Sequence, residues 1–180
     1  GTPVVLDPVG SGATVFRTET AKRIVRECMV SIIRGNSSEI LSLGGADAKT
    51  RGVDSANEVD DAAEIAAGLA SNLSCTLAIT GPVDLITDGS RIVRVANGHP
   101  MMPYVTGTGC SASAIIGAFR AVEEDPVAAA AGGLAFIGLA GEKAAERAEG
   151  PGSFMIALLD ALYTITPDDL RKGSRVIEEG

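Results

Sequence analysis

Short apolar runs alternate along this chain with longer stretches in which apolar residues recur at helical spacing. The runs are bounded by glycine, proline and polar residues, which is typical of short buried strands. They predict strands at residues 4–6, 29–33, 76–79, 83–86 and 92–95. Asp88-Gly89 lies between the last two runs, and an Asp-Gly pair in this position predicts a β-hairpin.

The longer stretches carry apolar and small residues three and four positions apart, which indicates helices with a buried face. Thr18 is a candidate cap of the first helix, and residues 44–55 are predicted to be a loop. The predicted helices cover residues 18–27, 37–43, 57–73, 111–122, 126–147 and 153–162, and a short charged helix begins near Pro167.

Strands that alternate with helices predict an α/β fold, in which a mostly parallel central sheet carries helices on both faces. No internal repeat or linker composition divides the chain, so we predict a single domain over residues 1–180. A buried strand at residues 4–6 is an unusual beginning for a domain. We therefore expect further N-terminal strands to be absent from this chain or supplied by another one.

Composition narrows the class of protein. The chain has 180 residues, a net charge of -8 and no basic run, so we expect no nucleic-acid partner. The longest apolar stretch, residues 127–141, is shorter than the ~20 residues that span a bilayer, so we expect no membrane segment. The three cysteines form no CxxC or Cys/His cluster, which favours a reducing, cytoplasmic location. Cys28 and Cys75 lie in or beside predicted core elements and are expected to be structural.

The sharpest chemical feature is Gly107-Thr108-Gly109-Cys110, directly before a predicted helix. Glycines let the backbone approach a ligand, and the first amides of a helix lack partners and attract anions. The turn is therefore a candidate phosphate site, and an ordinary glycine-rich helix entry is the alternative. Cys110 is either a polarising group or weak base at an accepting hydroxyl, or a small buried residue. The spacing matches neither a P-loop nor a dinucleotide-binding motif.

Polar residues also follow three predicted strands, at Asp7, residues 34–39 and Thr80-Gly81. Ligands bind at the carboxyl ends of strands in open α/β sheets, so we expect these residues to converge on one rim. Asp7 and Glu39 are candidate magnesium ligands, directly or through water, and Arg34 is a candidate phosphate partner. The alternatives are a loop-capping Asp, a solvated helix Glu and a surface Arg. The single histidine, His99, is interpreted as stabilising a turn.

The order of several motifs is more specific than any one of them. The motifs are DPVGSGAT at 7–14, FRT at 16–18, IRGNSSEI at 33–40, GVDS at 52–55, AITGPVD at 78–84, NGHP at 97–100, VTGTGC at 105–110, VEEDP at 122–126 and GPGSF at 150–154. Together, and in this order over nearly the whole chain, they resemble the hydroxyethylthiazole kinase family of the ribokinase-like superfamily.

The resemblance implies a ribokinase-like fold and ATP-dependent phosphorylation of 4-methyl-5-(2-hydroxyethyl)thiazole on its hydroxyl, in thiamine biosynthesis or salvage. By the family pattern Gly107 matches a substrate-binding position, and Cys110 matches the position at which ribokinase relatives carry a catalytic aspartate. We therefore assign Cys110 as catalytic. The resemblance together with the phosphate-site argument assigns five residues to ATP, namely Arg34, Asn36, Thr80, Thr108 and Gly109. It also implies Mg²⁺ at Asp7 and Glu39.

The family is usually trimeric, with its active site between neighbouring subunits, and its members carry a substantial segment before the strand that ends at Asp7. We therefore expect a homo-oligomer, or a complementing N-terminal chain, to complete the thiazole pocket. Two other functions stay open at this point. One is another ribokinase-like enzyme, such as a hydroxymethylpyrimidine kinase or a nucleotide-repair dehydratase, and the other is a non-catalytic binding or assembly module.

Overall fold

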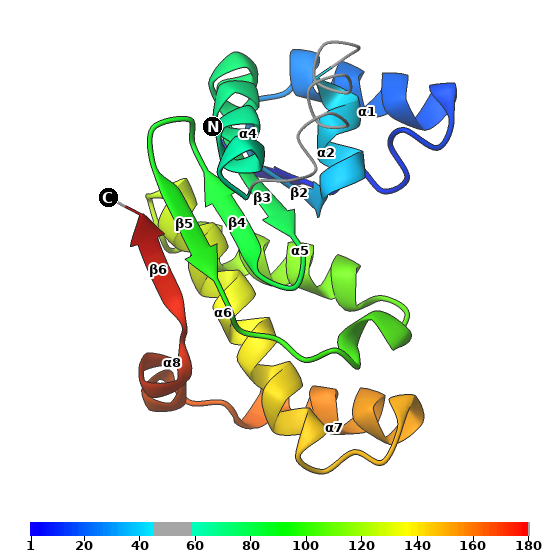
Figure 1. The fold of residues 1–180 in the computed structure, drawn as a ribbon, viewed down its shortest axis with the longest axis vertical. Coiled ribbons are helices and arrows are strands. Elements are labelled where there is room, and N and C mark those ends of the chain that lie inside the picture. The colour runs from blue at the N-terminus through cyan, green and yellow to red at the C-terminus, as the bar shows by residue number, and fades with distance from the viewer. Residues whose placement is uncertain (45–58, 180) are drawn as a thin grey trace.

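The computed structural model describes residues 1–44 and 59–179, and its strands form one six-stranded sheet (Figure 1). The strands lie side by side in their sequence order, which is β1 (Val4–Leu6), β2 (Val30–Asn36), β3 (Thr76–Thr80), β4 (Asp84–Thr87), β5 (Ile92–Val95) and β6 (Val176–Glu179). The pairings β1–β2 and β2–β3 are parallel, whereas β3–β4, β4–β5 and β5–β6 are antiparallel. The sheet is therefore mixed, and its parallel pairings are confined to the first three strands.

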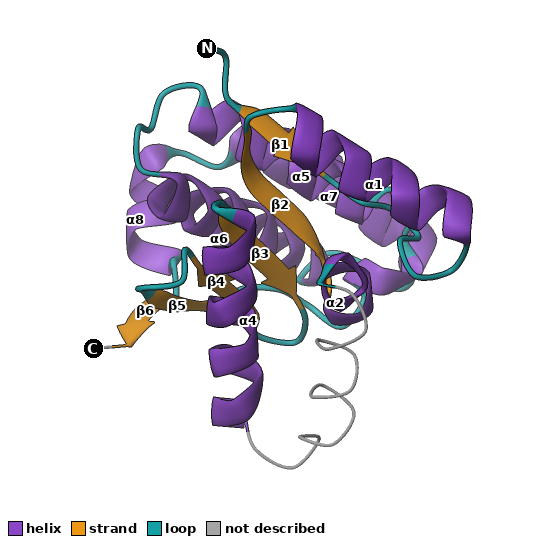
Figure 2. Cartoon of the chain, turned by 90° about the horizontal axis from the view of Figure 1, so that it is seen from above, coloured by secondary structure: helices purple, strands orange, loops and turns teal. Residues whose placement is uncertain are grey.

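Helices cover both faces of this sheet (Figure 2). One face carries α1 (Val15–Glu27), α2 (Ser37–Leu43) and α4 (Val59–Leu73), and the other carries α5 (Thr108–Arg120) and α6 (Pro126–Ala145). A 3₁₀ turn, η1 (Met102–Tyr104), precedes α5. α7 (Pro151–Thr164) packs on α6 away from the sheet, and α8 (Pro167–Gly173) leads into β6 (Figure 1).

Alternate side chains of the central strands build a separate core on each face. Ile32 of β2 packs in the cluster formed with α5 and α6, whereas Ile33 packs in the cluster formed with α1, α2 and α4. Ala78 and Leu77 of β3 repeat this alternation. Because successive strand residues point to opposite faces, a strand covered on both sides needs a nearly continuous apolar run, as these strands have.

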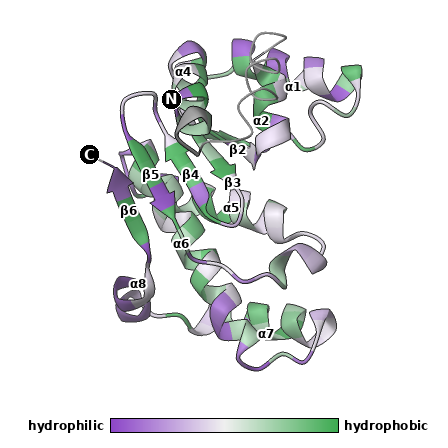
Figure 3. Cartoon of the chain, in the orientation of Figure 1, coloured by the Kyte–Doolittle hydropathy of each residue, from purple (hydrophilic) through white to green (hydrophobic). Residues whose placement is uncertain are grey.

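α6 consists largely of alanine and glycine and approaches its neighbours very closely. A Cβ at Gly138 would lie 2.6 Å from the Cβ of Asn97, and one at Gly133 would lie 2.9 Å from Cγ1 of Ile116. Figure 3 shows the hydrophobic character of α6 beside the polar α8. Within the described ranges, α6 alone is long and apolar enough to cross a membrane, but 72% of its apolar window is buried, as in a core helix.

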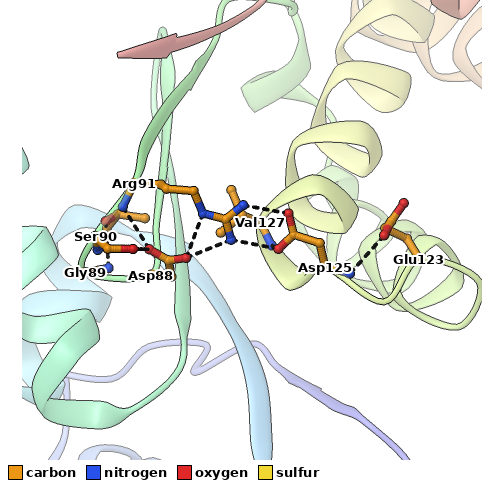
Figure 4. Close-up of polar contacts among 8 residues, drawn as sticks. Asp88, Gly89, Ser90, Arg91, Glu123, Asp125 and Val127 are labelled. Carbon is orange, nitrogen blue, oxygen red and sulfur yellow. Dashed lines mark hydrogen bonds and ion pairs between the residues drawn. The ribbon is translucent and has the colours of Figure 1, made fainter. Parts of the chain in front are cut away.

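Arg91 ties the tip of the predicted hairpin to the beginning of α6 (Figure 4). Its guanidinium donates two hydrogen bonds of 2.8 Å to the carboxylate of Asp125 and two of 2.8 and 2.9 Å to Oδ2 of Asp88. Asp125 is also the N-cap of α6, since its Oδ1 accepts the N–H of Val127 at 3.1 Å. One side chain therefore joins a β-turn to a helix N-terminus that is distant in the sequence.

The α/β fold with helices on both faces and a hairpin is confirmed. The predicted cap is wrong: the N-cap of α1 is Thr14, whose Oγ1 accepts the N–H of Arg17, and Thr18 lies within the helix. β6 is not predicted by the sequence, because this strand is short, charged and exposed. From residue 45 to 58, the predicted loop and the start of the following predicted helix lie outside the described residues. The single-domain assignment stays a prediction.

Candidate functional site

Arg34 brings the carboxyl ends of the three parallel strands together. It lies in β2, and its Nη1 donates to Oδ2 of Asp7 at 3.3 Å, just after β1. Its Nη2 donates to Oγ1 of Thr80 at 3.1 Å, at the end of β3. The side chains of Arg34 and Asp7 are only 14% and 15% exposed. The expected convergence of these polar residues on one rim is therefore confirmed.

The glycine turn before α5 lies at the same rim. Gly107 is the N-cap of α5 and has a φ of +97°, a left-handed conformation that favours glycine. A Cβ at Gly109 would lie 2.9 Å from Nη1 of Arg34, so the turn approaches the guanidinium closely. Because the first amides of α5 have no acceptor within the helix, they and Arg34 together offer several N–H donors to an anion.

Cys110 is the third residue of α5, and its side chain is exposed. The interpretation of Cys110 as a small buried residue is therefore wrong. Cys75 is buried, and burial raises the pKa of its thiol to about 11, which agrees with an inert structural role. Cys28, by contrast, is exposed at the C-cap of α1. The expectation that it has a structural role in the core is therefore wrong.

Glu39 and Asn36 form a capping box at the beginning of α2. Asn36 Oδ1 accepts the N–H of Glu39 at 3.0 Å, and Glu39 Oε2 accepts the N–H of Asn36 at 3.0 Å. The other oxygen of Glu39 accepts the N–H of Gly10 at 2.8 Å. The carboxylate therefore links the loop after β1 to the end of β2, so the alternative of a purely solvated helix Glu does not hold.

Asp7 lies within reach of two different elements. Its Oδ2 accepts the hydroxyl of Ser113 in α5 at 2.7 Å as well as the guanidinium of Arg34. A carboxylate has about four lone-pair sites, so Asp7 and Glu39 each retain acceptor capacity beyond these contacts. The part of the chain that the structure describes holds no group of three metal-ligating side chains. These two carboxylates fit Mg²⁺ held mainly through water and phosphate oxygens, which is how proteins commonly bind it.

A cleft of about 750 Å³ opens beside this rim. Five of the predicted site residues line it, namely Arg34, Asn36, Thr80, Thr108 and Gly109. Apolar residues also line it, namely the buried Leu134, Ile137 and Gly138 of α6 and the partly exposed Met102. The lining of the cleft therefore combines a cationic, donor-rich set of residues with an apolar set. Four other predicted site residues do not line the cleft, namely Asp7, Glu39, Gly107 and Cys110. Asp7 and Glu39 are hydrogen-bonded to the lining residues Arg34 and Asn36, and Gly107 and Cys110 flank the lining residues of the glycine turn in the sequence.

His99 also lines the cleft, but its contacts are structural. Its Nδ1 accepts the N–H of Met101 at 3.2 Å, and its ring stacks on Phe154 with 6.1 Å between the centroids. The nearby loop is held by Glu142 of α6, whose Oε1 accepts the N–H of Gly98 at 2.8 Å and the side-chain amide of Asn97 at 3.1 Å. The predicted turn-stabilising role of His99 agrees with this geometry.

Sequence reasoning missed several lining residues of the cleft, and Asp84 is the one among them that carries a charge. It is the first residue of β4, it is only 8% exposed, and it lines the cleft. Burial raises the pKa of its carboxyl to about 6, although the hydrogen bond from Gly81 N–H (3.0 Å) and the charge of Arg34 oppose this. The signal that could have found it is an acid placed directly before an apolar strand, three residues after a strand-ending Thr-Gly pair.

Comparison with known proteins identifies relatives of this chain. The model of the hydroxyethylthiazole kinase family matches residues 1–168. The chain belongs to this family. A hydroxyethylthiazole kinase from Desulfotalea psychrophila is 63% identical over 177 residues, which cover 98% of this chain and 65% of the relative. One from Moorella thermoacetica is 51% identical over 176 residues, covering 98% of this chain and 66% of the relative.

A solved structure of the hydroxyethylthiazole kinase protein from Pyrococcus horikoshii OT3 has the same fold, with a TM-score of 0.87 and 40% sequence identity. The match covers 99% of this chain and 66% of that one. The chain thus spans just under two thirds of the length of the relatives that it matches. In this member of the hydroxyethylthiazole kinase family, the converging strand ends and the glycine turn form the candidate site.

Proposed function

We propose that this chain carries the nucleotide-binding and phosphoryl-transfer part of a kinase that phosphorylates 4-methyl-5-(2-hydroxyethyl)thiazole with ATP. The observation that supports the proposal most directly is the contact between the glycine turn at 107–109 and the guanidinium of Arg34. The two provide backbone donors and a fixed cation in a cleft that is also lined by apolar residues. A triphosphate with an attached base has the same division between an anionic and an apolar part.

The proposed reaction is a transfer of the terminal phosphoryl group. The hydroxyl oxygen of the thiazole alcohol forms a bond to the γ-phosphorus, the bond from that phosphorus to the bridging oxygen breaks, and ADP leaves. The hydroxyl proton passes late to Cys110, the weak base assigned at this hydroxyl, or to water, because the transition state of such transfers is loose. Positioning and electrostatic stabilisation therefore provide most of the rate, which Arg34, Thr80 and the amides of Thr108 and Gly109 are placed to supply.

We assign Cys110 to the accepting hydroxyl and Gly107 to the substrate. Cys110 is exposed at the N-terminus of α5, one residue beyond the Gly109 that touches Arg34, so an alcohol bound there would lie beside the phosphate end. Asp7 and Glu39 would hold Mg²⁺, which when bound reduces the negative charge on the phosphates. The hydrogen bond from Arg34 to Asp7 supports this assignment, because it keeps the carboxylate of Asp7 beside the proposed phosphate partner.

We also propose a cytoplasmic homo-oligomer, for which the family resemblance implies a trimer. The three described cysteines are unpaired, which agrees with a reducing compartment. Large apolar side chains are exposed on α1 and α7, including Phe16 at 80%, Leu159 at 62% and Tyr163 at 90%. Exposed apolar surface of this kind is typical of subunit contacts.

The proposal is tested by an ADP-release assay on the intact protein with Mg-ATP and a panel of alcohols. We expect turnover of the thiazole alcohol to exceed that of hydroxymethylpyrimidine at equal concentrations. Faster turnover of the pyrimidine would instead identify a different kinase. ATP binding without turnover of any alcohol would identify a non-catalytic module, and the proposed reaction would be wrong.

A further inference from the structure

Asp84 is a buried acid that lines the cleft. Thr80, which contacts Arg34, is separated from Asp84 by a single tight turn. In the adjacent strand Asp84 pairs with Val95, whose side chain packs in the core formed with α6. Ile86, two residues further on, packs in the same core, so Asp84 and Ile86 face the same side of the sheet. The carboxylate therefore lies on the face of the sheet that α5 and α6 cover, near enough to Arg34 for the charge of the guanidinium to act on its pKa.

Only one oxygen of this carboxylate is used within the described part of the chain. Oδ1 accepts the N–H of Gly81 at 3.0 Å, and no described donor contacts Oδ2. Oδ2 is not one of the buried side-chain atoms that lack a partner, since among the described residues Nε of Arg34 is the one atom of that kind, so a ligand donor can reach Oδ2 from the cleft. A neutral asparagine would accept the same N–H at lower cost. The second oxygen of an acid that lines a ligand cleft therefore points to a donor on the ligand.

The chemistry of the cleft restricts which part of a nucleotide this donor belongs to. Phosphate oxygens carry negative charge and are repelled by a carboxylate, so the triphosphate belongs at Arg34 and Gly109. Among the apolar lining residues, Met102 and Pro103 keep exposed surface on which a base can lie. The ribose connects these two parts, and its hydroxyls are neutral donors that carboxylates commonly bind in nucleotide sites.

We propose that Asp84 recognises the ribose of the nucleotide, with Oδ2 accepting a hydrogen bond from a ribose hydroxyl while Oδ1 holds the turn at Gly81. The inference rests on the proposed function, since it requires a nucleoside triphosphate in this cleft. It makes Asp84 a specificity-determining residue that distinguishes a ribonucleotide from its deoxy analogues.

The test compares the dissociation constants of ATP, 2′-deoxy-ATP and 3′-deoxy-ATP for the intact protein, in the presence of Mg²⁺. A hydrogen bond to a charged group corresponds to a preference of about tenfold for ATP over the analogue that lacks the bonded hydroxyl. In Asp84→Ala the preference should fall to within about twofold, because no acceptor remains. Asp84→Asn retains an acceptor for Gly81, so this variant keeps the turn, and its preference should fall to about threefold or less.

Asp88→Asn is the matched control. Asp88 follows the other end of β4, and its Oδ1 also accepts a backbone N–H in a turn, from Ser90 at 2.9 Å, but it does not line the cleft. This variant should keep the wild-type preference. The inference is wrong if wild type binds ATP but does not discriminate, if both Asp84 variants still discriminate, or if Asp84 variants lose discrimination against inosine triphosphate instead. Failure of wild type to bind ATP would overturn the proposed function itself.

Discussion

Gly109 lies close to the guanidinium of Arg34, because a Cβ at position 109 would be 2.9 Å from its Nη1. The guanidinium is held on other sides by Asp7 and Thr80, so it cannot move away without breaking hydrogen bonds. The backbone of the helix N-terminus and the cation therefore occupy one small volume. This arrangement concentrates the donors that a terminal phosphate needs.

Gly109→Ala is expected to displace the guanidinium of Arg34 and weaken ATP binding by about tenfold, the equivalent of one lost charge-assisted hydrogen bond. Isothermal calorimetry with an ATP analogue that is not hydrolysed measures this change. Gly117→Ala is the matched control in the same helix, since a Cβ there would meet no atom within 4 Å. It should keep ATP affinity and stabilise the fold by about 1 kcal/mol through helix propensity. Equal ATP affinity in both variants would contradict the role of the contact.

Cys110→Ala is expected to lower kcat by about 100-fold, at the lower limit of what proton-transfer groups contribute. The dissociation constant of ATP should stay within about twofold, because Thr108 and Gly109, not Cys110, line the cleft. Steady-state kinetics and calorimetry on the same samples separate the two effects. Cys28→Ala, at another exposed cysteine, should change neither. A parallel loss of turnover and affinity in Cys110→Ala would indicate structural damage.

Asp84 predicts a specific dependence of stability on pH. Burial raises the pKa of its carboxyl from 3.8 to about 6, so between these values the folded state binds more protons than the unfolded state. Its contribution to the free energy of unfolding therefore decreases as pH rises from about 4 to about 6. Asp84→Asn removes this loss, and should be more stable than wild type at pH 7.5 by about 1–3 kcal/mol but equal to it near pH 4. Urea denaturation at both pH values measures the difference.

Asp88→Asn provides the opposite case for the same experiment. Burial acts against ionisation of Asp88, but hydrogen bonds from Arg91 and Ser90 hold the pKa of its carboxyl well below its usual range. Its stabilising contribution is therefore present above about pH 4 and is lost as pH falls. The variant should be less stable than wild type at pH 7.5. Identical pH profiles for the two variants would refute the assignment of opposite shifts.

Arg91→Ala is expected to lower the free energy of unfolding by about 1 kcal/mol and to leave turnover unchanged. The ion pairs of Arg91 with Asp88 and Asp125 are partly exposed, which limits their value even though the geometry is bidentate. Arg23→Ala removes an exposed helix pair with Glu27 and should cost only about 0.3 kcal/mol. Thermal unfolding of both variants checks this ranking. A change of turnover in Arg91→Ala would instead connect the hairpin tip to the site.

The sequence correctly predicted the strands and turns whose physical cause lies in neighbouring residues. The strands at 76–80 and 92–95 follow from apolar runs between turn residues, and the turn at Asp88-Gly89 follows from the left-handed φ of Gly89. The polar residues after β1, β2 and β3 identified the rim, because parallel strands end at the same edge. The ATP, magnesium, substrate and catalytic assignments stay predictions for the experiments above.

Local sequence patterns did not predict which strands pair or which side chains are buried. β6 pairs along its length with β5, and Arg94 and Glu179 form an ion pair across the two strands, but nothing near Glu179 in the sequence indicates that partner. The antiparallel direction of β4 and β5 extends through β6, so the sheet is less parallel than the alternation of elements predicted.

The sequence by itself determined the order of the helices and of the first five strands, the glycine turn and the family, because periodicity, turn chemistry and motif order are properties of neighbouring residues. Only the tertiary structure decided that Asp84 is buried in the cleft, that Cys110 is exposed, and that Gly109 touches Arg34. Burial and close contact depend on which distant segments pack together. The same Asp at the end of a turn is solvated in one fold and lines a ligand cleft in another.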